Sequence, residues 1–190
     1  MENKTELITL PNKHLRNTST KVGLITPQIK SIIENMKNTT LKWESSRDHE
    51  VGVALAAIQI DVPLRIIIVR RDIEDKADHT FDVFINAEIT KSEGEIVEDY
   101  EGCLSIKDIY GKVPRYSRVK IKALNENGEQ FRVTAEGFLA RIFQHEIDHT
   151  KGILFIDHIK DDKSAFYKLE KDGDLTEMDY DNVKKNNILW

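Results

Sequence analysis

The sequence predicts a single domain that mixes strands with helices, and three observations lead to this prediction. Apolar runs rich in β-branched residues at 64–69 and 81–89 are typical of buried strands. Asn127-Gly128 stands between two alternating segments and is the strongest short signal for a β-hairpin. Thr26-Pro27, an N-cap followed by proline at the first helical position, precedes apolar residues at helical spacing. At 190 residues the chain is long enough to bury one core.

The first half of the chain is expected to hold one amphipathic helix, one compact loop and one strand. The helix runs from Pro27 and fades by 43–46, with a single apolar stripe facing the core. Residues 49–59 are small and apolar, which favours a close-packed loop that ends in Gln59. That amide either satisfies buried backbone groups or serves a site as a neutral donor, and both interpretations stay open. The charged segment 70–80 is expected to be an exposed loop.

The second half is expected to consist of strands followed by a central helix. Its strands are predicted at 81–89, 93–100, 119–124 and 130–135. Val113-Pro114-Arg115 is expected to bend the chain between them. A helix then begins at Phe138 and ends near Gly152. Residues 155–159 are expected to form a short strand or turn, and 161–190 a short helix with a frayed end.

Composition excludes some classes of protein. The chain has 28 basic and 33 acidic residues and a net charge of −5, which argues against a dedicated nucleic-acid binder. No apolar run approaches the roughly 20 residues that span a bilayer, and the N-terminus lacks the apolar core of a signal peptide. We therefore expect a cytoplasmic protein without a membrane segment. Cys103 is the only cysteine, so it is a small buried hydrophobe, a thiolate ligand or a nucleophile.

The sequence His145-Glu146-Ile147-Asp148-His149 is the main candidate for chemistry. On a helix, two histidines four residues apart project from one face and can reach one metal ion. Glu146 lies beside that position, where it can take a proton from the attacking water and pass it to a leaving amine. The motif has only three fixed positions and occurs by chance, but apolar residues at helical spacing precede it. It therefore predicts a hydrolytic metal site on a half-buried helix.

A hydrolytic site of this kind needs a third protein ligand, and three candidates can be compared. An extended zincin pattern would place a third histidine where this chain has Phe155, which excludes that class. Glu170 lies at a plausible distance for a downstream carboxylate but sits in a polar tail. Cys103 is a soft ligand next to a glycine that lets backbone approach closely. Spacing alone leaves Glu170 and Cys103 open.

Three separated motifs resemble those of the peptide deformylases and occur in the same order. Residues 52–59 read G-V-A-L-A-A-I-Q, close to the family's G-x-G-L-A-A-x-Q loop. Residues 101–105 match E-G-C-L-S in full, and 144–149 match Q-H-E-x-D-H. With Val113-Pro114-Arg115 and the lead-in, the resemblance covers roughly residues 8–160.

The resemblance implies an α+β fold, with antiparallel sheets packed around a central helix bearing the H-E-x-x-H motif. We expect one catalytic domain over 1–165 and a C-terminal helix or tail over 166–190. The resemblance also implies one divalent metal ion held by Cys103, His145 and His149. Ferrous iron (Fe2+) is the expected metal, with zinc, nickel or cobalt as substitutes.

The resemblance further assigns roles to residues around that ion. Glu146 would be the general acid and base, and Gln59 and the backbone N–H of Leu104 would donate to the oxygen of the tetrahedral intermediate. Glu101 and Arg115 would pair to hold the cysteine turn. The substrate implied is the N-formyl group of nascent polypeptides that begin with formyl-methionine, and a transient association with the ribosome would follow. The expected substrate-binding residues are Gly52, Val53, Ala54, Glu101, Gly102, Phe138 and Ile142.

The chain also departs from the family pattern. Ala54 replaces the second glycine of the first motif, and its added Cβ either alters the approach of the backbone to the peptide or demands a negative φ there. Tyr110 stands where some relatives carry an arginine near the substrate. The stretch 160–190 has more acidic than basic residues, which argues against ribosome docking through a basic C-terminal helix. Two alternatives remain: a metallopeptidase that uses Glu170, and a non-catalytic relative that binds peptide.

Overall fold

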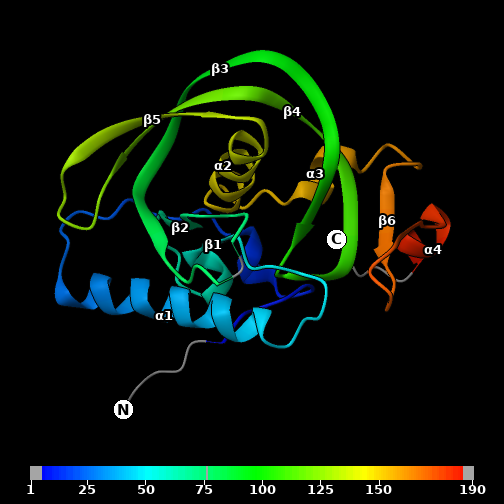
Figure 1. Cartoon of the computed structure of the whole chain (residues 1–190), viewed down its shortest axis with the longest axis horizontal. Coiled ribbons are helices and arrows are strands. Elements are labelled where there is room, and N and C mark those ends of the chain that lie inside the picture. Colours follow the sequence, from blue (N-terminus) through cyan, green and yellow to red (C-terminus); the bar gives the residue numbers. More distant parts are fainter. Residues whose placement is uncertain (1–5, 76, 186–190) are drawn as a thin grey trace.

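The computed structural model describes residues 6–75 and 77–185. Its centre is an antiparallel sheet with the strand order β1-β2-β3-β4-β6-β7, and β5 pairs with β4 beside this path. Figure 1 shows β3 and β4 arching over helix α2, while α1 lies along the opposite side of the molecule. The predicted α+β class, with an antiparallel sheet around a central helix, is confirmed.

The elements follow one another in a simple order. The helical segments are η1 (Lys13–Arg16), α1 (Pro27–Glu44), η2 (Ala57–Ile60), α2 (Gly137–His149), α3 (Phe155–Ile159) and α4 (Tyr180–Lys185). The strands are β1 (Ala54–Ala56), β2 (Ile66–Arg70), β3 (Phe81–Cys103), β4 (Ile106–Leu124), β5 (Gln130–Glu136), β6 (Phe166–Leu169) and β7 (Leu175–Glu177).

Helix α1 begins as the sequence predicted. The side chain of Thr26 accepts a hydrogen bond from the backbone N–H of Ile29, and Pro27 occupies the first turn. Ile29, Ile33 and Met36 are buried on one face of the helix, against β2 and the start of β3. Because these apolar residues share one face, α1 covers the core and exposes its polar residues.

Two predictions about the long strands were wrong. Segments 81–89 and 93–100 form one strand, β3, whose three register shifts before Ile96 absorb the irregular pattern that suggested a break. The bend expected at Pro114 is absent, and β4 continues through it, paired with Glu98 of β3. The opposite edge of β4 pairs with β6 before Pro114 and with β5 after it. A residue without an N–H is therefore tolerated at the unpaired stretch between them.

Two short segments also differ from expectation. Residues 49–59 were predicted as a loop, but Ala54 pairs with Val69 of β2, and the segment ends in β1 and η2. Pairing with β2, the next strand along the chain, overrides the local sequence here. Residues 155–159 form helix α3 rather than a strand or turn, because the carboxylate of Asp157 accepts from the N–H of Leu154 at the helix start.

Helix α2 lies inside the arch, where it is almost entirely buried. Phe143 of α2 packs edge-on against Phe84 of β3, with ring centroids 4.7 Å apart, and Ile147 joins the same cluster. On the side of α3, Phe155 and Phe166 belong to a second cluster. The histidine helix is thus held on both sides by packed apolar residues.

The C-terminal residues add two strands that the sequence did not indicate: β6 pairs with β4, and β7 pairs with β6. The short helix expected within 161–190 is α4. The frayed end predicted for the last residues falls on 186–190, outside the described residues. The boundary between a domain at 1–165 and a tail at 166–190 stays a prediction.

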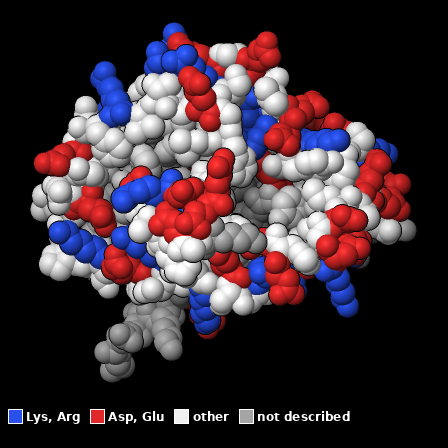
Figure 2. Space-filling view, in the orientation of Figure 1, with Lys and Arg blue, Asp and Glu red and all other residues white. Residues whose placement is uncertain are grey.

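The surface and the helices add two observations. Figure 2 shows basic and acidic side chains interspersed on the face it presents. Among the described residues, every helix is too short or too polar to cross a bilayer.

Candidate active site

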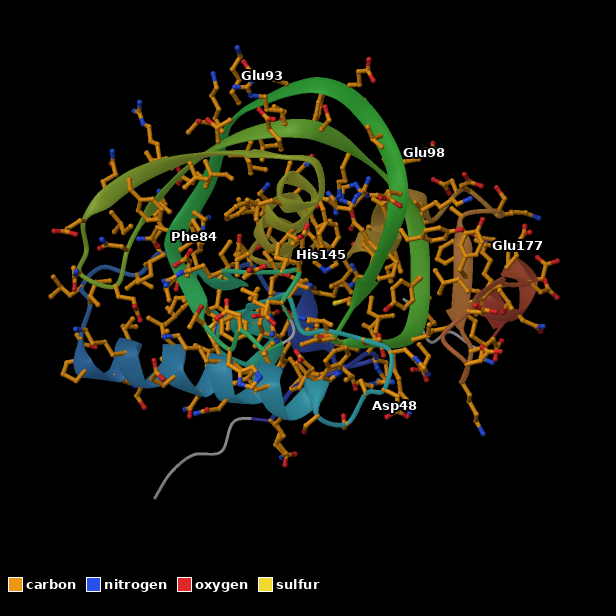
Figure 3. All side chains as sticks on the ribbon, in the orientation of Figure 1. Asp48, Phe84, Glu93, Glu98, His145 and Glu177 are labelled. Carbon is orange, nitrogen blue, oxygen red and sulfur yellow. The ribbon has the colours of Figure 1, made fainter. Side chains whose placement is uncertain are left out.

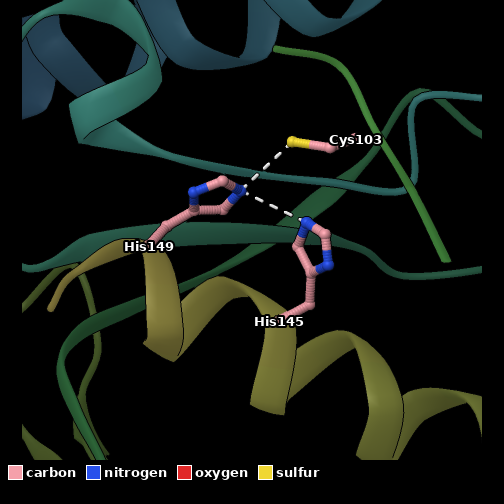
Figure 4. Close-up of side chains that lie close together, drawn as sticks. All are labelled: Cys103, His145 and His149. Atoms are coloured by element: carbon pink, nitrogen blue, oxygen red, sulfur yellow. Dashed lines mark hydrogen bonds between the residues drawn. The ribbon is translucent and has the colours of Figure 1, made fainter. Parts of the chain in front are cut away.

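Cys103, His145 and His149 converge beneath the arch although they lie far apart in sequence. The Sγ of Cys103 is 3.3 Å from Nε2 of His149, and the two Nε2 nitrogens of the histidines are 3.2 Å apart (Figure 4). Among the described residues this is the one group of three or more His, Cys, Asp or Glu ligand atoms that lie within 4.8 Å of one another.

The donor set fits a single divalent metal ion. Two nitrogens and one sulfur bound tetrahedrally at about 2.1 and 2.3 Å lie roughly 3.4 to 3.6 Å apart, close to the separations found here. One thiolate and two imidazoles leave a fourth position free, which is typical of catalytic rather than structural sites. Cys103, His145 and His149 can therefore hold the ion that the sequence predicted.

The local sequence explains how each ligand is placed. His145 and His149 are one turn apart on α2, so both rings leave the same face, and His145 points into the space beneath the arch (Figure 3). Cys103 is the last residue of β3, and a tight turn through Leu104 and Ser105 leads into β4. The cysteine thus reaches α2 from the end of β3, a strand that is anchored by pairing with β4 along most of its length.

Glu146 is the buried carboxylate of the site. It is 5% exposed, lines the cavity next to the ligands, and its Oε2 has no hydrogen-bond partner among the described residues. Burial raises the pKa of Glu146 to about 7. A carboxylate with a free oxygen in such a place is equipped to exchange protons with a molecule in the cavity.

Gln59 is held with its amide nitrogen toward the cysteine turn. Its Oε1 accepts from the backbone N–H of Ala56 at 2.9 Å, and its Nε2 donates to Oγ of Ser105 at 3.1 Å. The same Nε2 lies 3.5 Å from Sγ of Cys103. Gln59 therefore satisfies a buried backbone group and also places its amide nitrogen beside Cys103, while its role as a donor to substrate stays a prediction. Leu104 lines the cavity as well.

The predicted pair of Glu101 and Arg115 is confirmed and belongs to a larger buried network. Nε and Nη2 of Arg115 donate to the two oxygens of Glu101 at 2.9 and 3.1 Å, and Arg141 donates to Oε1 at 2.9 Å. Nδ1 of His145 lies 3.0 Å from Oε2 of Glu101. Burial acts to raise the pKa of Glu101, but hydrogen bonds from His145 and Arg115 outweigh it and lower the pKa to about 2.

A cavity of about 320 Å³ opens from the site to the surface. Six of the seven predicted substrate-binding residues line it, namely Val53, Ala54, Glu101, Gly102, Phe138 and Ile142. Gly52 is not among the lining residues. A Cβ there would lie 2.5 Å from Cγ2 of Thr40, so this glycine permits close packing against α1. Ala54 is buried in β1 and is not one of the described residues with positive φ, as its added Cβ requires.

The structure adds five lining residues that the sequence did not indicate: Trp43, His49, Glu50, Val51 and Tyr100. Tyr110, which the family pattern had put near the substrate, lines the same cavity. The hydroxyl of Tyr110 donates to Glu50 at 2.9 Å, and its ring covers Gly102, where a Cβ would lie 2.6 Å from the ring. These residues come from the end of α1, the following loop and two strands. They carry no motif, because only folding brings them together.

The alternative third ligand is excluded by position. Glu170 accepts hydrogen bonds from Nζ of Lys168 at 3.0 Å and from Oγ1 of Thr176 at 3.0 Å, and it is absent from the group around His145. Phe155, which stands where the extended zincin pattern has histidine, packs in the core with its ring 6.1 Å from that of His145. A metallopeptidase that uses Glu170 would therefore lack its third metal ligand.

Comparison with known sequences also indicates the peptide deformylases, over most of the chain. The model of the family described as polypeptide deformylase matches residues 4–165. The peptide deformylase of Aquifex aeolicus (strain VF5) is 40% identical over 155 residues, which is 82% of this chain and 87% of the relative. That of Halothermothrix orenii is 44% identical over 145 residues, or 76% of this chain and 86% of the relative.

Solved structures agree with the sequence comparison. A peptide deformylase from Synechococcus elongatus in complex with actinonin superimposes with a TM-score of 0.72 and 32% identity, covering 81% of this chain and 78% of that one. A peptide deformylase from Legionella pneumophila has a TM-score of 0.71 and 37% identity, covering 80% and 84%. Sequence and architecture thus lead to one conclusion: the chain belongs to the polypeptide deformylase family.

Proposed function

We propose that this chain hydrolyses the N-formyl group of nascent polypeptides that begin with formyl-methionine and releases formate. The observation that carries the proposal is the free Oε2 of Glu146, buried at the inner end of the cavity beside Cys103, His145 and His149. Membership of a deformylase family supplies the bond that is cleaved.

Cys103, His145 and His149 would hold one divalent metal ion. When bound, such an ion lowers the pKa of a water molecule and polarises a carbonyl oxygen. Ferrous iron is our proposal for the metal, with zinc, nickel and cobalt as substitutes. A ligand set with one soft thiolate and two imidazoles supports this choice, because it suits first-row transition metals better than magnesium or calcium.

Three groups of the chain would act on the formyl group. Glu146 would take a proton from the attacking water and deliver it to the amine that leaves. Nε2 of Gln59 and the backbone N–H of Leu104 would donate to the oxygen on which negative charge develops. The bond from Gln59 to Ser105 supports this role, because it holds the amide nitrogen in one orientation before substrate arrives.

The cavity also supports selection of the first residue. Val53, Phe138 and Ile142 give it an apolar wall, against which a methionine side chain can pack. Cys103, His145 and Glu146 line its buried inner end, while Phe138 is 52% exposed. A formyl group, the smallest acyl group, would lie inside, with the peptide leaving toward solvent.

We also propose where the protein works. Its substrate is made in the cytoplasm, so we infer cytoplasmic action and a transient association with the ribosome. The excess of acidic over basic residues in 160–190 means that this association would not depend on a basic C-terminal helix. The catalytic domain would comprise 1–165.

The assay for this function is formate release from a formyl-methionine peptide. Replacing Glu146 by Gln should lower kcat by about 10²- to 10⁴-fold, because the proton carrier is lost. Elemental analysis should show unchanged metal content, since Cys103, His145 and His149 remain. The matched control is Glu170→Gln, which removes the alternative carboxylate and should leave formate release intact. Undiminished turnover by the Glu146 variant would refute its assigned role, and cleavage of internal peptide bonds would favour a peptidase.

A further inference from the structure

The C-terminal hairpin, defined as β6, β7 and the turn between them (residues 166–177), packs against the outer wall of the cavity. It lies beyond residues 4–165, which match the family model. In Figure 1 it stands beside β4 at the edge of the sheet. It touches the wall at Tyr100, Tyr110 and His49, as the following contacts show.

The first contact is a cluster on one face of the sheet. Tyr167 of β6 is the cross-strand partner of Tyr110, which lines the cavity. The ring of Tyr167 packs edge-on against that of Tyr100, with centroids 4.9 Å apart and an interplanar angle of 83°. Nζ of Lys112 lies over both rings, at 5.2 Å from Tyr100 and 5.1 Å from Tyr167. Aromatic and cation–π contacts therefore join the hairpin to a ring of the wall.

The second contact is at the tip of the hairpin. A Cβ placed on Gly173 would lie 3.1 Å from Cγ of His49, so the turn packs directly against the imidazole. His49 lines the cavity and belongs to the loop after α1. The hairpin thus braces two separate parts of the wall, one on β3 and one on this loop.

The position of these residues indicates which part of a substrate they would meet. The reacting groups are deeply buried, whereas Tyr100 is 37% exposed and His49 is exposed. A peptide whose formyl group reaches Glu146 can extend toward solvent along this exposed part of the lining, past Tyr100 and Tyr110.

We propose that the C-terminal hairpin positions the outer wall of the cavity through the packing of Tyr167 on Tyr100, and so sets the affinity for peptide residues beyond the first two. Tyr167 is a positioning residue, because it acts through Tyr100 and does not line the cavity. This proposal rests on the proposed function for the identity of the substrate.

The test compares two substrates, formyl-Met-Ala and formyl-Met-Ala-Ala-Ala. Replacing Tyr167 by Ala should raise KM for the tetrapeptide roughly two- to tenfold, the range expected for one edge-on aromatic pair. Its kcat, and both constants for the dipeptide, should stay unchanged. Tyr167→Phe keeps the ring and should restore the wild-type KM. Lys168→Ala is the matched control, because the neighbouring side chain pairs with Glu170 on the other side of the strand.

A double variant separates positioning from a general loss of structure. If Tyr167 acts through Tyr100, then Tyr100→Ala combined with Tyr167→Ala should have the same tetrapeptide KM as Tyr100→Ala alone. Tyr167→Leu keeps most of the buried volume and replaces the alanine variant if that variant fails to fold.

Two results would overturn the hairpin proposal: an unchanged tetrapeptide KM in the Ala and Leu variants, or an equal fall in kcat for both peptides. If the wild-type protein released no formate from either peptide, the proposed function would fail instead. The hairpin proposal would then be decided by calorimetric binding of the tetrapeptide, which should weaken in Tyr167→Ala and stay unchanged in Lys168→Ala.

Discussion

Oε2 of Glu101 lies 3.0 Å from Nδ1 of His145, the ring nitrogen that faces away from Cys103. Glu101 precedes the cysteine by two residues and His145 is on α2, so this contact joins the strand that carries one ligand to the helix that carries the others. A carboxylate in this place fixes the orientation of the imidazole and leaves Nε2 as the free ligand atom.

Replacing Glu101 by Gln should therefore weaken metal binding. Loss of a carboxylate behind a histidine ligand typically costs about 10- to 100-fold in metal affinity. The measurement is competition for the metal between protein and a chelating dye, at fixed pH. Glu88→Gln, at a half-buried carboxylate of β3 that pairs with Lys21, is the control. Equal affinities in wild type and Glu101→Gln would show that the contact does not orient His145.

Arg115 should matter for stability, because its buried guanidinium satisfies two acidic residues. It donates to Glu101 and, at 2.6 Å, to Oδ2 of Asp148. Arg115→Ala removes this cation from both carboxylates, although Arg141 still donates to Glu101, and breaking a buried pair in this way costs about 3–5 kcal/mol in the free energy of unfolding. Urea denaturation of the wild type and the variant measures this difference in the free energy of unfolding. Arg71→Ala, at the exposed pair with Asp82, should leave the midpoint unchanged.

A double-mutant cycle checks that the effect arises from the Glu101–Arg115 pair. The coupling energy between Arg115→Ala and Glu101→Gln should fall within about 0.5–3 kcal/mol, as for other contacting residues. Additive losses would mean that the two side chains stabilise the protein independently.

Removal of the metal should lower thermal stability in a way that depends on Cys103. A ligand present at 100 times its Kd stabilises the folded state by about 2.7 kcal/mol, and a chelator removes that contribution. We expect chelation to lower Tm in the wild type and to leave Tm unchanged in Cys103→Ala, which should not retain the ion. Differential scanning calorimetry with and without chelator measures both. A chelator effect that persists in Cys103→Ala would exclude the thiolate as a ligand.

Gly52→Ala should destabilise the protein through a clash with Thr40. The added Cβ would lie 2.5 Å from Cγ2 and 3.2 Å from the carbonyl oxygen of that threonine. Overpacking of this kind costs about 1–3 kcal/mol in the free energy of unfolding. Thr40→Ser removes Cγ2 and keeps the hydroxyl that donates to Met36, so it should restore part of the loss in the double variant.

The matched control for this pair is Gly23→Ala. A Cβ at Gly23 meets no atom within 4 Å, so the free energy of unfolding of Gly23→Ala should match that of the wild type. A stable Gly52→Ala variant with altered formate release would instead place Gly52 in contact with substrate, as the sequence suggested.

The sequence alone determined the parts of this protein whose signals are local. Helix α1 follows from the Thr26 cap and the apolar stripe behind it, and β5 follows from the turn at Asn127-Gly128. The four-residue spacing of His145 and His149 is enough by itself to put both imidazoles on one face of a helix. Such signals are short-range, because they depend on residues within a few positions of one another.

Tertiary structure decided what depends on contacts between distant residues. It joined two predicted strands into β3, carried β4 through Pro114, and turned segment 54–56 into a strand by pairing it with β2. It also chose Cys103 over Glu170 as the partner of the histidines, and it brought Tyr100, Tyr110 and Tyr167 to one wall. The physical reason is that a sheet is stabilised by pairing between residues far apart in the chain, so its register and neighbours are set only when the whole chain folds.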